Sequence, residues 1–349
     1  MRPIKVLVVD DSAVVRQTIV EILSGDRRVR VLGAVADPIF AMQRMRAEWP
    51  DVIVLDIEMP RMDGLTFLGL VMAARPTPVV VCSSLTGRGA AMTFKALAAG
   101  AVTVVEKPRS GVRRHLTDAS AELIHSVKAA AAAKVHNLRL RAAEPAAATG
   151  PDRARPAALR GRAGDGVVAI GASTGGPQAL EAILTQLPAE TPAILIVQHM
   201  PEKFTAAFAQ RLDSICRISV NEAQDMDAVL PGRALVAPGG RHMALVRDGA
   251  GYAVRVRRGP MVNHHCPSVD VLFRSVADHA GARALGILLT GMGGDGALGL
   301  KQMQEAGART VAQDEATCVV FGMPKEAIKL GAADQVLALP HIAGEIERE

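Results

Sequence analysis

Short apolar runs alternate with amphipathic segments along the sequence, and this alternation restricts the fold more than any other feature. In the first part of the chain the apolar runs cover residues 4–10, 29–35, 51–56, 78–83 and 101–108. Helix-like segments separate them, at residues 13–23, 38–49, 64–74 and 90–100. Strands that are apolar almost throughout and are joined by helices form parallel sheets covered on both faces. We therefore expect an α/β protein that begins with a five-stranded, doubly wound parallel-sheet domain.

The same alternation resumes in the second half of the chain. Strand-like runs lie at residues 166–173, 193–199, 233–238, 284–291, 309–314 and 335–340. The helix expected at 202–213 places Phe204, Phe208 and Leu212 on one buried stripe. Two alternating runs within 242–259 flank Asp-Gly-Ala-Gly, which predicts an antiparallel hairpin. The second domain is therefore predicted to be a Rossmann-like parallel sheet with an added hairpin.

A stretch rich in Pro, Gly, Ala and Arg separates the two patterns and has no apolar periodicity, as is typical of a linker. We expect a first domain at 1–125, a helix end and flexible basic linker at 126–164, and a second domain at 165–349. Residues 109–164 carry eleven Lys and Arg against four Asp and Glu, a surplus of seven, so the rest of the chain sums to −2 and the net charge of +5 comes from this segment. Charge confined to a connector does not indicate a nucleic-acid partner, because a DNA-reading domain carries it on a folded face.

The cysteines indicate a reducing compartment. Cys82, Cys216, Cys266 and Cys318 lie far apart in the sequence and form no paired C-x-x-C spacing. No apolar run approaches the ~18 residues of a membrane span. We therefore expect a cytoplasmic protein without direct membrane insertion.

Charged and hydroxyl side chains lie at the ends of several strands expected in the first domain. Asp10 and Asp11 end the first strand, Asp56 ends the third, Ser83 the fourth and Lys107 the fifth. Clustered carboxylates need a hard cation, and Mg²⁺ is the natural one. A carboxylate beside Mg²⁺ and a lysine can accept a phosphoryl group, which predicts Asp56 as that acceptor.

Helix capping is the alternative interpretation of these residues. For Asp11 or Ser12 taken singly, helix capping is about as good an explanation as a phosphoryl site. It does not explain the ordered set "VDDS", "LDIEMPRMDG", "SSLT" and "EKP".

With these motifs, residues 1 to about 125 resemble a receiver domain of the two-component response regulators, which implies a flavodoxin-like fold. The resemblance implies that Asp56 is phosphorylated, that Asp10, Asp11 and Asp56 bind Mg²⁺, and that Ser83 and Lys107 contact the phosphoryl group. One position departs from the pattern: receivers commonly carry an aromatic residue three positions before the lysine, and this chain has Val104. A coupling that depends on rotation of an aromatic ring is therefore not expected here.

Ser173 lies in the glycine-rich segment "GASTGG", between a strand and a helix. A hydroxyl there could be a nucleophile, part of a phosphate-binding turn or a helix cap. A dinucleotide site would require G-x-G-x-x-G and an acid about 20 residues further on. The chain instead has Ser173 at the position of the second glycine, and its next strand ends in His199.

Ser173, His199 and Asp295 occupy three strand ends of the second domain, where side chains of a parallel sheet converge. Acyl transfer needs this set: Ser173 attacks, His199 carries the proton, and Asp295 orients the imidazole. Taken singly, Ser173 and Asp295 could each cap a helix and His199 could be structural.

Two other segments contain residues that often carry chemistry. His264, His265 and Cys266 are adjacent in "NHHCPSVD", but zinc sites usually have a second paired set of ligands. Cys318 lies in an apolar setting that favours a buried small residue. We expect no cofactor in the second domain.

The motifs "IGASTGGPQAL", "VQHMPEKFTAAFAQRLD", "PSVDVLF", "LLTGMGGDGALGL" and "AQDEATCVVFGMPKEA" resemble the catalytic domain of the chemotaxis protein-glutamate methylesterases. This resemblance, with the receiver, covers nearly the whole chain. It implies the catalytic triad Ser173, His199 and Asp295. It also implies that the following residues lie near the oxyanion or substrate: Thr174, Gly175, Met292 and Gly293. The segment "NHHCPSVD" departs from the usual single His followed by Arg.

The resemblance also implies a function. The expected reaction is hydrolysis of glutamate γ-methyl esters on the cytoplasmic domains of methyl-accepting chemoreceptors, with release of methanol, and deamidation of receptor glutamines. A chemotaxis histidine kinase would donate the phosphoryl group to Asp56 and relieve restraint by the receiver. We expect recruitment to receptor arrays and no nucleic-acid partner. A DNA-binding regulator would need a helix-turn-helix, and an oxidoreductase would need the dinucleotide fingerprint.

Overall fold

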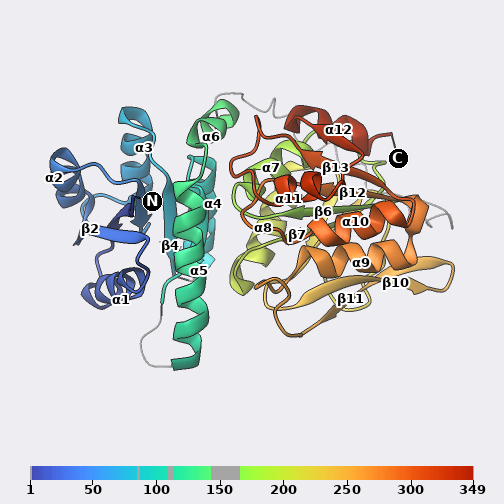
Figure 1. Ribbon diagram of the computed structural model, residues 1–349, viewed down its shortest axis with the longest axis horizontal. Coiled ribbons are helices and arrows are strands. Elements are labelled where there is room, and N and C mark those ends of the chain that lie inside the picture. Colours follow the sequence, from blue (N-terminus) through green and yellow to red (C-terminus); the bar gives the residue numbers. More distant parts are fainter. Residues whose placement is uncertain (1, 85–86, 109–112, 143–165, 349) are drawn as a thin grey trace. The chain divides into compact units, whose positions relative to one another are not determined.

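The computed structural model describes residues 2–84, 87–108, 113–142 and 166–348 (Figure 1). The chain divides into two compact units, Met1–Glu144 and Pro145–Glu349. Much of the first part of the expected linker is helical up to Ala142, and the part from 143 to 164 lies outside the described residues. No described helix is long and apolar enough to cross a membrane.

Five parallel strands form the sheet of the first unit, in the order β2-β1-β3-β4-β5. The strands are β1 (Ile4–Val9), β2 (Val29–Val35), β3 (Val52–Leu55), β4 (Val79–Ser83) and β5 (Thr103–Glu106). The helices are α1 (Ala13–Ser24), α2 (Pro38–Ala47), α3 (Gly64–Ala74), α4 (Gly87–Ala98), α5 (Arg113–Ala131) and α6 (Val135–Ala142). This strand order confirms the prediction of a flavodoxin-like domain.

The first unit is built from apolar strands and locally capped helices. All of β3 and β4 is buried, as are the last four residues of β1. Helix α1 packs against α5, and α3 packs against α4. Short polar side chains accept hydrogen bonds from the first turns of three helices: Ser12 for α1, Asp37 for α2 and Asp63 for α3. The capping interpretation is therefore correct for Ser12.

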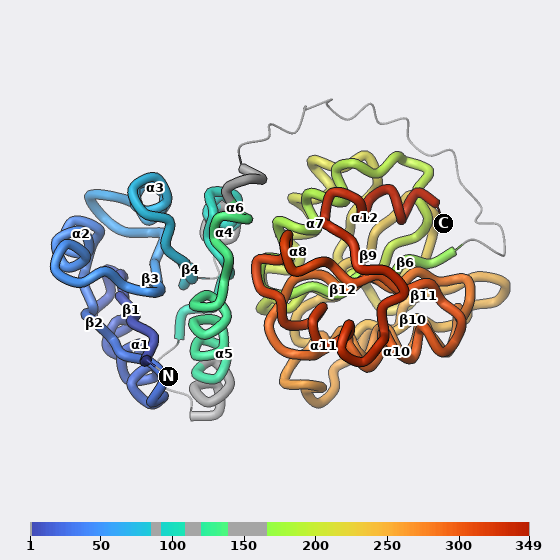
Figure 2. Tube along the Cα trace, turned by 45° about the horizontal axis from the view of Figure 1, so that its top comes forward, coloured from blue at the N-terminus to red at the C-terminus, as the bar shows by residue number. Residues whose placement is uncertain are grey.

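Seven parallel strands form the sheet of the second unit, in the order β14-β13-β12-β6-β7-β9-β8. The strands are β6 (Val167–Ala172), β7 (Ala193–Gln198), β8 (Ser219–Glu222), β9 (Arg233–Val236), β12 (Ala284–Leu288), β13 (Arg309–Gln313) and β14 (Gln335–Leu337). The helices are α7 (Gly176–Leu184), α8 (Glu202–Ile215), α9 (Val269–His279), α10 (Ala297–Glu305), α11 (Met323–Lys329) and α12 (Leu339–Ile346), with a 3-10 turn η1 (Gly281–Arg283). Helices α10 and α11 lie side by side (Figure 2). The predicted second parallel-sheet domain is confirmed.

Strands β10 (His242–Asp248) and β11 (Gly251–Arg257) pair antiparallel, which confirms the predicted hairpin. The inward side chains Met243, Leu245 and Val254 belong to the main core, which also contains residues of α9. The predicted stripe on α8 is confirmed, since Phe204, Phe208 and Leu212 are at most 1% exposed.

The strand order places a topological switch in the second unit. Strand β7, which follows β6 in the chain, lies on one side of β6 in the sheet, and the later strand β12 lies on its other side. The carboxyl ends of β6 and β12 are therefore adjacent, and the turns that follow them lie next to each other. Such a switch point is where ligands bind in open α/β sheets.

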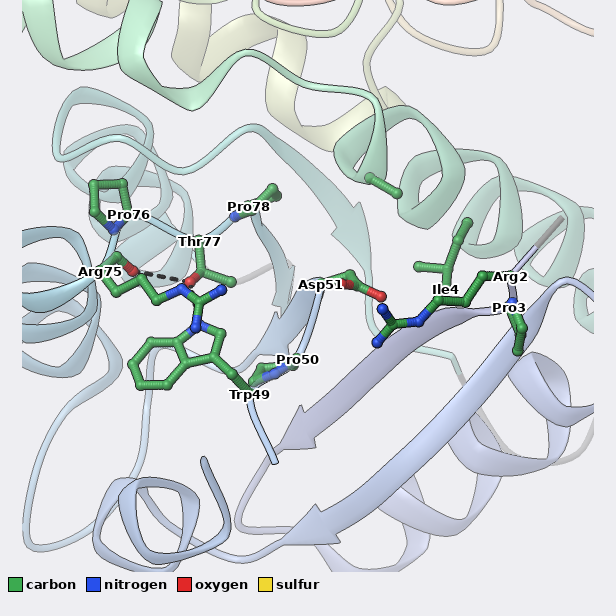
Figure 3. A pocket seen from close by; sticks show the side chains of 11 residues that line it. Arg2, Pro3, Ile4, Trp49, Pro50, Asp51, Arg75, Pro76, Thr77 and Pro78 are labelled. Atoms are coloured by element: carbon green, nitrogen blue, oxygen red, sulfur yellow. Dashed lines mark hydrogen bonds between the residues drawn. The ribbon is translucent and has the colours of Figure 1, made fainter. Parts of the chain in front are cut away.

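A pocket of about 390 Å³ lies in the first unit at the start of β1 and just before β3 (Figure 3). Its walls include Trp49, Arg75 and Thr77. The Trp49 indole N–H donates to the Thr77 hydroxyl at 2.8 Å, and the Arg75 guanidinium lies 5.2 Å from the centre of the indole ring. Because the predicted acids follow the carboxyl ends of β1 and β3, this pocket belongs to the opposite edge of the sheet.

Candidate active site

Ser173 lies in a turn that is fixed by its own backbone. Its N–H donates to the Thr290 carbonyl at 3.0 Å, and its carbonyl accepts from the Gly176 N–H at 2.7 Å. The Gln198 side-chain amide donates to the same Ser173 carbonyl at 3.0 Å. The residue is 7% exposed, and its hydroxyl has no hydrogen-bond partner among the described residues. The turn thus holds the backbone while the hydroxyl is left available.

The structure does not support the capping interpretation of Ser173 and Asp295. The N-cap of α7 is Gly175, at φ 76°, and the N-cap of α10 is Gly296, at φ 90°. A Cβ at Gly175 would lie 2.5 Å from Val319 Cβ, so the turn requires glycine for both its conformation and its packing. Glycines therefore occupy both N-cap positions, and neither Ser173 nor Asp295 caps a helix.

His199 follows β7 directly and lies next to the turn of Ser173. Its N–H donates to the Ala172 carbonyl at 3.0 Å, and Gln198 bonds the carbonyls of both Ser173 and His199. On the imidazole, Nε2 is 2.8 Å from Asp295 Oδ2, and the side chain is 7% exposed. Nδ1 is buried and has no partner within the described part of the chain.

Asp295 lies in the turn between β12 and α10 and accepts hydrogen bonds from four residues besides His199. The partners and distances are Ser268 Oγ at 2.7 Å, the Val269 N–H at 2.7 Å, Asn263 Nδ2 at 2.8 Å and the Asp270 N–H at 3.3 Å. The carboxylate is 1% exposed. A buried carboxylate with this many donors remains ionised.

The pKa of Asp295 reflects these contacts. Burial alone would raise it, but the hydrogen bonds and charge of His199, with the bonds from Asn263 and Ser268, hold the pKa well below its usual range. An ionised Asp295 requires His199 Nε2 to carry a proton and to donate. The atom left to accept a proton is therefore Nδ1, the reverse of the usual assignment in Ser-His-Asp triads.

The four residues expected near the oxyanion lie in the two turns at the switch point. The Thr174 carbonyl accepts from Thr290 Oγ1 at 2.9 Å, which fixes the Thr174–Gly175 peptide. Met292 is half-buried, and Gly293 has φ 91°. A Cβ at Gly291 would lie 2.7 Å from Ser173 Cβ, so the two turns approach closely. Backbone N–H groups of these turns can serve as oxyanion donors.

Sequence reasoning missed the residues that hold the predicted set in place. Gln198 and Thr290 fix the turns, and Asn263 and Ser268 hold Asp295. His265 lies with its ring stacked on His199, the centroids 3.6 Å apart. The polar segment 263–268 is the sequence signal for Asn263 and Ser268, but its adjacent His and Cys residues point to a metal site rather than to support of Asp295. Cys318 is fully buried, as expected.

In the first unit, the predicted acids meet at the carboxyl edge of the sheet. Ligand oxygens of Asp10, Asp11 and Asp56 lie within 4.8 Å of one another. Lys107 Nζ lies 2.7 Å from Asp56 Oδ2 and 2.9 Å from Asp10 Oδ2. Asp10 and Asp56 are buried and Asp11 is exposed, so the cluster has one open side. Oxygen ligands with room for water fit Mg²⁺.

Charges in this cluster oppose one another. Burial raises the pKa of Asp56 to about 6, although Lys107 acts in the opposite direction, and Asp10 adds repulsion. Burial would lower the pKa of Lys107, but its bonds to Asp56 and Asp10 raise it. The ionised Asp56 is thus incompletely compensated, and an added cation would relieve it.

Ser83 and Val104, the other two positions considered in the receiver resemblance, lie on the neighbouring strands β4 and β5. Ser83 ends β4, is 3% exposed and donates from its hydroxyl to the Ser84 carbonyl at 3.2 Å. Its own carbonyl accepts from the Lys107 N–H at 3.1 Å. Val104 on β5 is 5% exposed, a small buried side chain where many receivers have an aromatic ring.

Comparisons with known proteins agree with both halves of this description. The family model of the response regulator receiver domain matches residues 6–118, and that of the CheB methylesterase matches residues 168–346. The protein-glutamate methylesterase/protein-glutamine glutaminase 2 of Dechloromonas aromatica (strain RCB) is 57% identical, over 98% of this chain and 97% of its own. The corresponding enzyme 1 of Pseudomonas savastanoi pv. phaseolicola (strain 1448A / Race 6) is also 57% identical, over 98% and 97%.

A solved structure supports the fold of the second unit. The crystal structure of the Thermotoga maritima CheB methylesterase catalytic domain matches with a TM-score of 0.52 and 38% identity, covering 53% of this chain and 98% of that chain. The resemblance inferred from the motifs is therefore confirmed. The chain belongs to the family of protein-glutamate methylesterase/protein-glutamine glutaminases that carry a receiver domain before a CheB methylesterase domain.

Proposed function

We propose that the second unit hydrolyses glutamate γ-methyl esters and deamidates glutamines of methyl-accepting chemoreceptors through Ser173, His199 and Asp295. The proposal rests on the hydrogen bond between His199 Nε2 and Asp295, whose carboxylate is held by four further donors. This bond leaves His199 Nδ1 as the atom that can accept a proton. The buried Ser173 lies in the neighbouring turn. The 57% identity to enzymes named for these two activities supports the substrate class.

The reaction follows from these atoms. Ser173 Oγ attacks the ester carbonyl carbon while its proton passes to His199 Nδ1, and backbone N–H groups at Thr174, Gly175, Met292 or Gly293 bind the oxyanion. His199 then gives the proton to the leaving oxygen, so methanol departs and a Ser173 acyl-enzyme remains. Water, deprotonated by His199, then attacks the acyl carbon; the bond to Ser173 Oγ breaks, His199 returns the proton to that oxygen, and glutamate is released. In deamidation, ammonia leaves in place of methanol.

We further propose that the first unit regulates this activity through phosphorylation of Asp56 by a chemotaxis histidine kinase. Asp10, Asp11 and Asp56 would hold Mg²⁺, which when bound supplies positive charge against the phosphoryl oxygens. Lys107 contributes a second positive charge, and Ser83 a hydroxyl, at the same edge. The raised pKa of Asp56 supports this role, because the protein does not fully balance the negative charge of the ionised carboxylate and an added cation would.

The chemistry is tested by methanol release from a methylated receptor cytoplasmic fragment. Ser173→Ala should lower turnover by roughly 10⁴- to 10⁶-fold. The matched control is Ser214→Ala, whose hydroxyl donates to the Arg211 carbonyl on α8 and should leave turnover unchanged. Mass spectrometry of the parent, quenched during turnover, should find the glutamyl adduct on the peptide that contains Ser173. Retention of most activity by Ser173→Ala would refute the proposal.

A further inference from the structure

The residues around His265 form a tight turn with an unusual backbone. Val262 and His265 bond each other in both directions, at 3.0 Å and 2.9 Å. The two residues between them, Asn263 at φ 52° and His264 at φ 66°, are both left-handed. Asn and His adopt left-handed conformations more readily than most residues other than glycine, and two in succession form the tight turn of a two-residue hairpin. The turn thereby fixes the positions of the Asn263 and His265 side chains.

The side chains of this turn reach two residues of the proposed triad. Asn263 Nδ2 donates to Asp295 Oδ1 at 2.8 Å and to Asp270 Oδ2 at 2.7 Å. His265 lies against His199 with ring centroids 3.6 Å apart and an interplanar angle of 10°. The turn thus contacts both partners of the His199–Asp295 pair, which suggests a role in the reaction.

The geometry of the two rings is informative about charge. A centroid separation of 3.6 Å between nearly parallel rings leaves little lateral offset, so the rings overlap face to face. Two neutral aromatic rings disfavour this arrangement and prefer an offset or an edge-to-face contact. A cation above the face of a neutral ring is attracted to it. The observed stack therefore suits one protonated and one neutral imidazole better than two neutral ones.

In the proposed reaction His199 becomes an imidazolium as it takes the proton of Ser173. An interaction that strengthens only then lowers the barrier, because it stabilises the transition state more than the ground state. We propose that His265 is a positioning residue that stabilises the protonated His199 through this face-to-face stack. This inference rests on the proposed function of the triad and requires His265 itself to be neutral.

The experiment separates a ring effect from simple packing. Three variants are compared in the full chain: His265→Phe keeps a ring face, His265→Leu keeps apolar bulk without a ring, and His265→Gln keeps polarity without a ring. The control is His341→Leu, an exposed histidine on α12 of the same unit. Thermal unfolding of each variant checks that the fold is retained. Methanol release from the methylated receptor fragment gives kcat and KM for each.

We expect Leu and Gln at position 265 to lower kcat by roughly 2- to 30-fold, the size of a cation–π interaction, with KM within about 2-fold of the parent. Phe should keep kcat within about 2-fold of the parent. Equal kcat for Phe and Leu, or a change in KM instead of kcat, would overturn the proposal. Failure of the proposed function gives a different result, since Ser173→Ala would then retain activity whatever residue occupies position 265.

Discussion

Two buried carboxylates at comparable places in the two sheets have opposite surroundings. Asp56, after β3 of the first unit, faces the ammonium of Lys107, the carboxylate of Asp10 and one backbone N–H, that of Glu58 at 3.2 Å. Asp295, after β12 of the second unit, accepts from His199 and four other donors. Burial dominates at Asp56 and raises its pKa to about 6, whereas the donors dominate at Asp295 and lower its pKa.

The difference matches the roles that we propose for the two carboxylates. A group that must accept a phosphoryl group and a metal ion needs lone pairs that the protein leaves uncompensated. A group that must hold a histidine through every turnover needs a permanent charge and a fixed position. The incomplete charge compensation of Asp56 and the full hydrogen bonding of Asp295 fit these two proposed roles, and substitutions at the two sites test the contrast.

Asp295→Asn should have the largest effect. It removes the charge that stabilises protonated His199 while nearly preserving the size of the side chain, so kcat should fall roughly 10⁴-fold. Methanol release at saturating receptor fragment measures this, with Asp278→Asn on the exposed face of α9 as the control. A loss smaller than about 10-fold would mean that the charge of Asp295 is dispensable.

Lys107→Met should destabilise the first unit by about 3 kcal/mol or more at pH 7.5, because it leaves two buried carboxylates without their cation. Trp49 is the only tryptophan of the chain and lies in the first unit, so its fluorescence in urea reports the unfolding of that unit. Added Mg²⁺ should recover part of the loss. An unchanged unfolding midpoint without Mg²⁺ would contradict the assigned role of Lys107.

Asp56→Asn should instead stabilise the first unit, in a way that depends on pH. A pKa raised from 3.8 to about 6 means that the folded protein binds the proton more tightly than the unfolded chain. The ionised group then opposes folding by about 3 kcal/mol above pH 6, and this penalty disappears as pH falls below 4. Without Mg²⁺, the Trp49 midpoint of the variant should exceed that of the parent at pH 7.5 and converge with it near pH 4. A gain that is the same at both pH values would exclude this origin.

Ser268→Ala should have the smallest effect, because Asp295 keeps its other four donors. We expect a loss of about 1 kcal/mol in unfolding free energy and less than a 10-fold loss in kcat. Thermal unfolding and methanol release measure the two quantities. A loss of kcat comparable to that of Asp295→Asn would show that the donors act as one unit rather than as redundant supports.

The sequence predicted the residues that follow strands better than the residues that support them. Ser173, His199 and Asp295 lie directly after apolar runs or in the glycine-rich turns that follow them, and parallel sheets bring such positions to one edge. Asn263 and His265 contact residues 32 and 66 positions away in the sequence, through a left-handed turn that no local pattern predicts. Strand β8 was missed because it lies at the sheet edge and buries only Val220 completely.

The contrast between the two carboxylates is tested most directly by adding a small phosphodonor and Mg²⁺ during methanol release. The parent and Asp56→Asn are compared in the same assay, with Ser173→Ala as the blank. We predict that the phosphodonor accelerates the parent by roughly 5- to 150-fold, the usual range of coupling between two sites, and leaves Asp56→Asn unchanged. Equal rates with and without the phosphodonor in the parent, or equal acceleration of Asp56→Asn, would contradict the assignment of Asp56 as the reactive carboxylate that controls the catalytic unit.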